Sequence, residues 1–90
     1  MIYNIYTEDK NRVTLLNLIS DRFPSFTLFE AQGYWKGNSE ATLVIQIIAR
    51  AKAKPSIYRL AREIATVNDQ EAVLVITTTA RSSKFIGPIK

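Results

Sequence analysis

Two runs of the sequence, residues 42–48 and 72–78, are apolar at both alternating positions of an extended strand. Their β-branched content favours strands, yet a strand with one solvated face would alternate apolar and polar residues. The apolar members of the two runs are Leu43, Val44, Ile45, Ile47, Ile48, Val73, Leu74, Val75 and Ile76. Because leaving such a side chain in water forgoes about 1.5–3 kcal/mol, we expect both faces of the sheet that holds these strands to be covered.

The composition allows one small domain and excludes several kinds of chemistry. The chain has 90 residues, 47% of them apolar, which is enough for a single core. We expect one domain over residues 1–80 and a polar tail over 81–90. The absence of cysteine and histidine excludes disulfides, Cys/His metal sites, thiol nucleophiles and Ser-His-Asp triads. No metal and no cofactor are expected, and carboxylates, tyrosines and lysines remain for catalysis.

The charge balance favours an anionic partner. Twelve lysines and arginines against eight acidic residues give a net charge of +4. The alternative is that the spread basic residues only keep the domain soluble. The first residues lack a signal-peptide pattern, and the longest apolar run, Leu43–Ile48, is too short to span a bilayer. We therefore expect a cytoplasmic protein without a membrane partner.

Periodicity predicts four strands and two helices. Apolar residues recur at spacings of three and four between residues 9 and 23, and again after Pro55, which suits the first turn of a helix. Residues 32–38 contain two glycines and predict a hairpin connection. The expected elements are a strand over 2–6, a helix over 9–23, strands over 26–31 and 42–48, a basic loop over 50–55, a helix from 55 to 67, and a strand over 72–78.

This order of elements predicts a ferredoxin-like βαββαβ fold of the α+β class. Right-handed crossovers arrange it as a four-stranded antiparallel sheet with two helices on one face. The other face would then expose the apolar strands described above. We therefore expect a homo-oligomer in which another copy covers that face. The alternative is that the C-terminal tail folds back over it.

The hairpin segment 33–40 is the first candidate ligand site. Tyr34 and Trp35 offer a surface for stacking, and the glycines let the backbone approach a ligand closely. Glu40 could accept a proton, or bind a hydroxyl or ammonium group of a ligand. The alternative is that the aromatic rings close one end of the core and that Glu40 is solvated.

Two further segments carry candidate binding residues. Arg50, Lys52 and Lys54 precede a helix N-terminus, where backbone N–H groups favour a phosphate or carboxylate, although an ordinary solvated loop would look the same. Gln70 and Glu71 precede the last strand and could reach the cleft of a neighbouring chain. A nucleic-acid partner is not expected, because residues 42–48 lack the aromatic side chains on which an RNA-recognition domain stacks bases.

Several short motifs resemble one known group of proteins. They are Gly33-Tyr34-Trp35-Lys36-Gly37, Glu40 before a β-branched strand, Leu60-Ala61-Arg62-Glu63-Ile64, and Asn68-Asp69-Gln70-Glu71-Ala72-Val73-Leu74-Val75. Over residues 26–79 the chain resembles small phage-type proteins of the PII-like superfamily, and within that superfamily the phage S-adenosylmethionine lyases. It is shorter than those lyases and lacks their extended C-terminal part.

The resemblance implies a PII-like homotrimer whose sheets face inward and whose ligand clefts lie between subunits. Tyr34 would line the cleft, Glu40 would meet the polar or cationic end of the ligand, and Gln70 and Glu71 would come from the adjoining subunit. The expected function is binding of an adenine-containing nucleotide or related small metabolite, with Tyr34 or Trp35 stacked on the base and the basic loop on phosphate. Such a protein would sequester a metabolite or regulate its use, in the bacterial host cytoplasm if phage-encoded.

Two alternative functions stay open. One is cleavage of S-adenosylmethionine, with Glu40 as the catalytic residue. It would need few protein groups, because holding the sulfonium and carboxylate of the substrate in the right geometry promotes intramolecular attack. The other is a structural or interaction protein that binds no small molecule.

Overall fold

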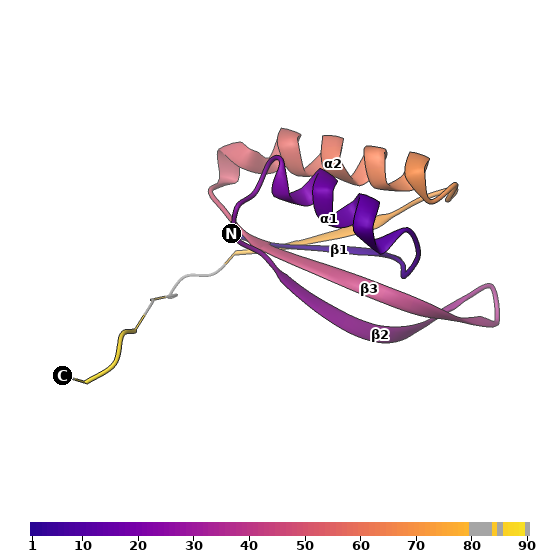
Figure 1. The fold of residues 1–90 in the computed structure, drawn as a ribbon, viewed down its shortest axis with the longest axis horizontal. Coiled ribbons are helices and arrows are strands. Elements are labelled where there is room, and N and C mark those ends of the chain that lie inside the picture. Colours follow the sequence, from indigo (N-terminus) through magenta and orange to yellow (C-terminus); the bar gives the residue numbers. More distant parts are fainter. Residues whose placement is uncertain (80–83, 85, 90) are drawn as a thin grey trace.

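The structure, a computed structural model, describes residues 1–79, 84 and 86–89. Its elements are β1 (Ile2–Glu8), α1 (Arg12–Ser20), β2 (Thr27–Trp35), β3 (Asn38–Ile48), the short 3-10 helix η1 (Ala51–Ala53), α2 (Lys54–Val67) and β4 (Leu74–Thr78). Both α-helices lie on the same side of the sheet (Figure 1). The predicted ferredoxin-like α+β fold is therefore confirmed.

The sheet has the order β2-β3-β1-β4, and every neighbouring pair is antiparallel. On β1 and β3, Ile2 pairs with Ile48 and Glu8 pairs with Thr42. The end of β1 that leads into α1 therefore lies beside the middle of β3, and residues 38–41 of β3 extend beyond it into the hairpin. The opposite end of β3 lies beside the N-terminus, where the Met1 amino group donates a hydrogen bond to the Ala49 carbonyl at 2.7 Å.

The core lies between the helices and the face of the sheet that they cover. Alternate strand residues point to this face, and the apolar stripe of α2 packs against them. Pro55 lies in the first turn of α2, where its missing N–H group is not needed. The buried cluster comprises Tyr3, Ile5, Leu15, Ile19, Leu43, Ile45, Ile47, Ile57, Leu60, Ala61 and Ile64.

The first helix is shorter than the predicted span 9–23. Asn11 adopts a left-handed conformation with φ 55°, so that α1 begins only at Arg12. At the other end, the N–H groups of Arg22 and Phe23 both bond to the Ile19 carbonyl, and the chain leaves the helix as a turn. Pro24 accounts for this end, because it disfavours helical geometry at the residue before it.

The hairpin connection predicted over 32–38 is also mostly strand. Pairing between β2 and β3 continues to Trp35 and Asn38, leaving a two-residue turn of Lys36 and Gly37. Both turn residues have positive φ, 50° and 82°, as a tight hairpin turn requires. The basic loop predicted over 50–55 likewise becomes η1 and the first turn of α2. Both segments have the polar composition that is typical of loops. They nevertheless form the backbone hydrogen bonds of a strand pair and of helical turns.

The helix-free face of the sheet is apolar and open in a single chain. Phe29 is 46% exposed, Ile48 55%, Leu74 58% and Ile76 42%, whereas Val44 among them is buried. Both faces of the folded sheet are thus apolar, as the sequence predicted. Whether another copy covers this face stays a prediction.

The C-terminal tail predicted over 81–90 is described only in part. Residues 80–83, 85 and 90 lie outside the described residues, so the predicted domain boundary at 80 falls there as well. Ile86 and Ile89 are fully or almost fully exposed, and residues 86–89 lie away from the sheet (Figure 1). These four residues therefore do not cover the helix-free face.

Candidate functional site

A cleft of about 380 Å³ opens where the helix-free face meets the hairpin. Three segments line it: residues 6–10 at the end of β1, residues 33–35 and 40–42 of the hairpin, and residues 69–74 between α2 and β4. The β1–β3 register brings the first two segments together, and the end of α2 adds the third. The cleft therefore exists only once the whole sheet has formed.

Aromatic residues lie along one wall of the cleft. Tyr6, Tyr34 and Trp35 contribute to its lining, and Tyr34 and Trp35 are 72% and 54% exposed. Beside them Gly33 lets the Thr42 hydroxyl approach the backbone closely, because a Cβ atom at position 33 would collide with that hydroxyl. The rings of Tyr34 and Trp35 are largely exposed and do not close the core. As neighbours on a strand they point to opposite faces of the hairpin, and the Lys36 Nζ atom lies 5.8 Å from the centroid of the Trp35 ring.

A pair of carboxyl groups, Glu8 and Glu40, lies beside this wall. Burial raises the pKa of Glu40 above its ordinary value of 4.5, and a hydrogen bond with Glu8 and the charge of Glu8 add to the effect. The pKa of Glu8 is lowered instead, mainly by Lys10, whose Nζ lies 2.8 Å from a Glu8 carboxylate oxygen. As the pH falls, Glu40 is therefore the member of the pair that takes up a proton first.

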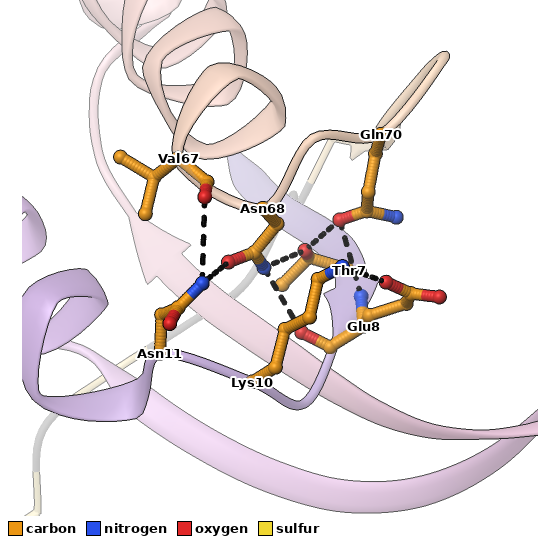
Figure 2. Close-up of polar contacts among 7 residues, drawn as sticks. All are labelled: Thr7, Glu8, Lys10, Asn11, Val67, Asn68 and Gln70. Atoms are coloured by element: carbon orange, nitrogen blue, oxygen red, sulfur yellow. Dashed lines mark hydrogen bonds and ion pairs between the residues drawn. The ribbon is translucent and has the colours of Figure 1, made fainter.

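The connection from α2 to β4 is held in place by its backbone and by side chains. Asp69 has φ 51°, and the N–H groups of Asp69 and Gln70 bond back to Thr66 and Ala65, which ends the helix in a Schellman motif. The Gln70 Oε1 atom accepts hydrogen bonds from the Thr7 hydroxyl and from the Glu8 N–H group (Figure 2). These bonds fasten Gln70 to the end of β1 at the cleft.

Five of the residues proposed from the sequence meet in this cleft. They are Tyr34, Trp35, Glu40, Gln70 and Glu71. The resemblance assigned Gln70 and Glu71 to an adjoining subunit, whereas here one chain supplies all five. Glu71 also lies 3.6 Å from the Lys36 Nζ atom on the hairpin turn.

The basic residues Arg50, Lys52 and Lys54 lie elsewhere. They follow the last residue of β3, whereas Glu40 lies near its start, so roughly 25 Å of extended strand separates the two sites within one chain. The Arg50 carbonyl accepts a hydrogen bond from the Tyr3 hydroxyl at 3.0 Å, and the Lys54 Nζ atom lies 5.7 Å from the centroid of the Tyr58 ring. These three cations do not reach a ligand in the cleft of their own chain.

Other lining residues were not foreseen, namely Tyr6, Glu8, Lys10 and Asp69. No spacing motif joins them to the hairpin, since Glu8 precedes Glu40 by 32 residues and Asp69 follows Glu40 by 29. One available signal was the predicted topology, because the ferredoxin-like order makes β1 and β3 neighbours. It could have placed Glu8 near Glu40 only if the register had also been known.

Two comparisons with known proteins found no match. No family model matches the chain, and no curated protein is significantly similar to it.

Two structural findings concern metals and membranes. In the part of the chain that the structure describes, no three potential ligands among the acidic side chains come together to hold a metal ion. Over the same residues, no helix is long and apolar enough to cross a bilayer.

The sign of the charge in the cleft is opposite to that of the chain. Four acidic residues line the cleft, Glu8, Glu40, Asp69 and Glu71, against one basic residue, Lys10, and the Lys36 Nζ atom lies 3.6 Å from the Glu71 carboxylate. The whole chain carries +4. A cleft that combines acidic groups with accessible aromatic rings suits a flat ligand that carries positive charge.

Proposed function

We propose that the protein is an oligomeric PII-like module that binds a small, positively charged, adenine-containing metabolite of the S-adenosylmethionine type. The observation that carries this proposal is the combination of four acidic and three aromatic residues along one cleft. A phosphate-bearing nucleotide fits less well, because the cations proposed to bind phosphate lie at the other end of β3. The function is therefore sequestration or sensing of a cationic metabolite.

The apolar helix-free face supports assembly. Phe29, Ile48, Leu74 and Ile76 are each about half exposed. Burying the remaining half of each side chain contributes about 0.7–1.5 kcal/mol, or about 3–6 kcal/mol per copy for the four together. Leu74 also lines the cleft. A copy packed on this face would therefore form a further wall of the ligand site.

Titration calorimetry with three ligands tests the binding proposal. We expect S-adenosylmethionine to bind at least tenfold more tightly than S-adenosylhomocysteine, which lacks the sulfonium methyl group and its positive charge, and ATP to bind weakly. Trp35→Ala and Glu40→Gln should weaken binding of S-adenosylmethionine. Lys52→Ala, at the other end of β3, is the matched control and should leave its Kd unchanged. Tighter binding of ATP than of S-adenosylmethionine would refute the charge argument, and no binding of any of the three would favour a purely structural protein.

Light scattering at micromolar concentration tests assembly. Ile76→Glu places a charge on the helix-free face and should reduce the measured mass to that of a single folded chain. Val13→Glu is the matched control, because Val13 is 75% exposed on α1, on the opposite side of the sheet. A single-chain mass for the wild-type protein would contradict the assembly proposal.

Cleavage of the same ligand is the second candidate, favoured by the Glu8–Glu40 pair at the cleft. In this reaction the carboxylate of S-adenosylmethionine attacks its own γ-carbon and the C–S bond breaks. Methylthioadenosine leaves as a neutral thioether and homoserine lactone forms. No protein group needs to transfer a proton, and Glu40 would hold the cationic part of the substrate. Chromatography for methylthioadenosine with wild type and Glu40→Gln decides this question: no product from wild type excludes the lyase.

A further inference from the structure

A continuous chain of hydrogen bonds runs from the start of α1 to the cleft through Asn68, which is 1% exposed. The Asn11 Nδ2 atom donates to the Asn68 Oδ1 atom at 3.1 Å. The Asn68 Nδ2 atom donates to the Thr7 Oγ1 atom at 3.0 Å and to the Glu8 carbonyl at 3.2 Å. The Thr7 hydroxyl in turn donates to the Gln70 Oε1 atom. Figure 2 shows the whole series.

Backbone groups determine the direction of every bond in this series. The Val67 and Glu8 carbonyls can only accept, so the side-chain nitrogens of Asn11 and Asn68 must face them. The Thr7 hydroxyl accepts from Asn68, and its single proton is therefore left for Gln70. The Glu8 N–H group can only donate, and it points at the same Gln70 atom at 3.3 Å. That atom must be the amide oxygen.

This assignment determines what Gln70 presents to a ligand. A flipped Gln70 amide would place its NH2 group against two donors, Thr7 and the Glu8 N–H group. In the unflipped amide the nitrogen points away from the network (Figure 2), and it has no hydrogen-bond partner among the described residues. Gln70 lines the cleft together with Tyr34 and Trp35. The NH2 group of Gln70, a residue of the cleft lining, can thus act only as a donor.

We propose that Gln70 is a specificity-determining residue, whose N–H groups bind a hydrogen-bond acceptor on the aromatic ring of the ligand. A ring nitrogen of a purine is such an acceptor. Thr7 and Asn68 are the positioning residues that hold the amide in this orientation. The inference deepens the function proposed above and rests on it for the identity of the ring.

Adenosine and its deaza analogues, in each of which one ring nitrogen is replaced by C–H, test the donor role. Wild-type protein should bind at least one deaza analogue about tenfold more weakly than adenosine, because one hydrogen bond is lost. Gln70→Glu keeps an oxygen for Thr7 and Glu8 but cannot donate, so the ratio between adenosine and that analogue should fall to about one. Equal binding of adenosine and all deaza analogues by wild type would overturn the proposal.

The positioning role has a readout that a merely structural role would not change. Thr7→Val removes the hydroxyl with almost no change in shape, and should reduce the ratio between the affinities for adenosine and the deaza analogue. Thr7→Ser restores the hydroxyl and should restore the ratio. A ratio that is unchanged in Thr7→Val would show that Thr7 does not position Gln70.

A measurement on the ligand-free protein separates this inference from the proposed function. Proton exchange followed by NMR should show protected side-chain NH2 protons for Asn68 and rapidly exchanging ones for Gln70. If adenosine and S-adenosylmethionine both fail to bind, the adenine-binding function is wrong, and the exchange measurement still decides the donor orientation. Protected Gln70 NH2 protons would overturn it.

Discussion

Replacing Asn68 by alanine should destabilise the domain strongly, although Asn68 lies outside the apolar core. Its side chain makes three hydrogen bonds, to Asn11, Thr7 and the Glu8 carbonyl, while almost completely buried. Each such bond contributes about 0.5–1.5 kcal/mol, and the buried partners would lose their contacts. We predict a loss of about 2–4 kcal/mol in the free energy of unfolding, against a total of roughly 5–13 kcal/mol for a chain of this size. The corresponding fall in Tm is roughly 10–25 °C.

Urea unfolding followed by circular dichroism measures this loss, at equal protein concentrations because assembly also contributes to stability. Asn17→Ala is the matched control. Asn17 is exposed on α1, and alanine has the higher helix propensity there, so the variant should be as stable as wild type or about 0.5 kcal/mol more stable. If Asn68→Ala lies within about 0.5 kcal/mol of wild type, the network in Figure 2 does not hold the α2–β4 connection in place.

Three further predictions concern the cleft and its surroundings. Glu40→Gln should stabilise the protein at pH 7, because the raised pKa of Glu40 means that the folded state disfavours its charged carboxylate. The gain should disappear once the pH lies below the ordinary pKa of 4.5. A loss of stability at pH 7, measured by urea unfolding, would contradict this prediction. Gly33→Ala should lower the free energy of unfolding by about 1–3 kcal/mol, because the new Cβ atom would collide with the Thr42 hydroxyl. Adding Thr42→Ala should recover much of this loss in a double-mutant cycle, whereas additive losses would show that the two sites do not interact. Asp69→Gly should stabilise the protein by about 0.5–1 kcal/mol in thermal unfolding, because glycine adopts the left-handed geometry at the end of α2 without strain; unchanged stability would contradict this.

The residues that line the cleft differ in net charge from the whole chain, and the anionic partner expected from composition stays a prediction. The net charge of +4 predicted an anionic ligand, and three cations before a helix N-terminus supported that interpretation. Folding places those cations at one end of β3 and gathers four acidic residues at the other. Net charge sums over the surface, whereas a ligand responds to the few groups within about a Debye length of it.

Local pattern was sufficient for the architecture. The helical stripe of α2, Pro55 at its start and the β-branched strands each depend on neighbours a few residues away, so the sequence alone determined the order of elements, the fold class and the apolar character of both sheet faces. The sequence also singled out the hairpin aromatics and Glu40, which the structure places along one cleft, and their role in binding stays a prediction. The ends of elements were less predictable, because Asn11, Lys36 and Asp69 take left-handed conformations that composition does not require of them.

Only the tertiary structure decided which chemical groups share the cleft. Glu8 lies near Glu40 because β1 pairs with β3 in one register, and a shift of one residue would turn the Glu8 side chain to the other face. The orientation of the Gln70 amide depends on Thr7 and Asn68, which are brought together from opposite ends of the chain. Such relations arise between segments far apart in sequence, where pairing and packing rather than local preference determine what each side chain contacts.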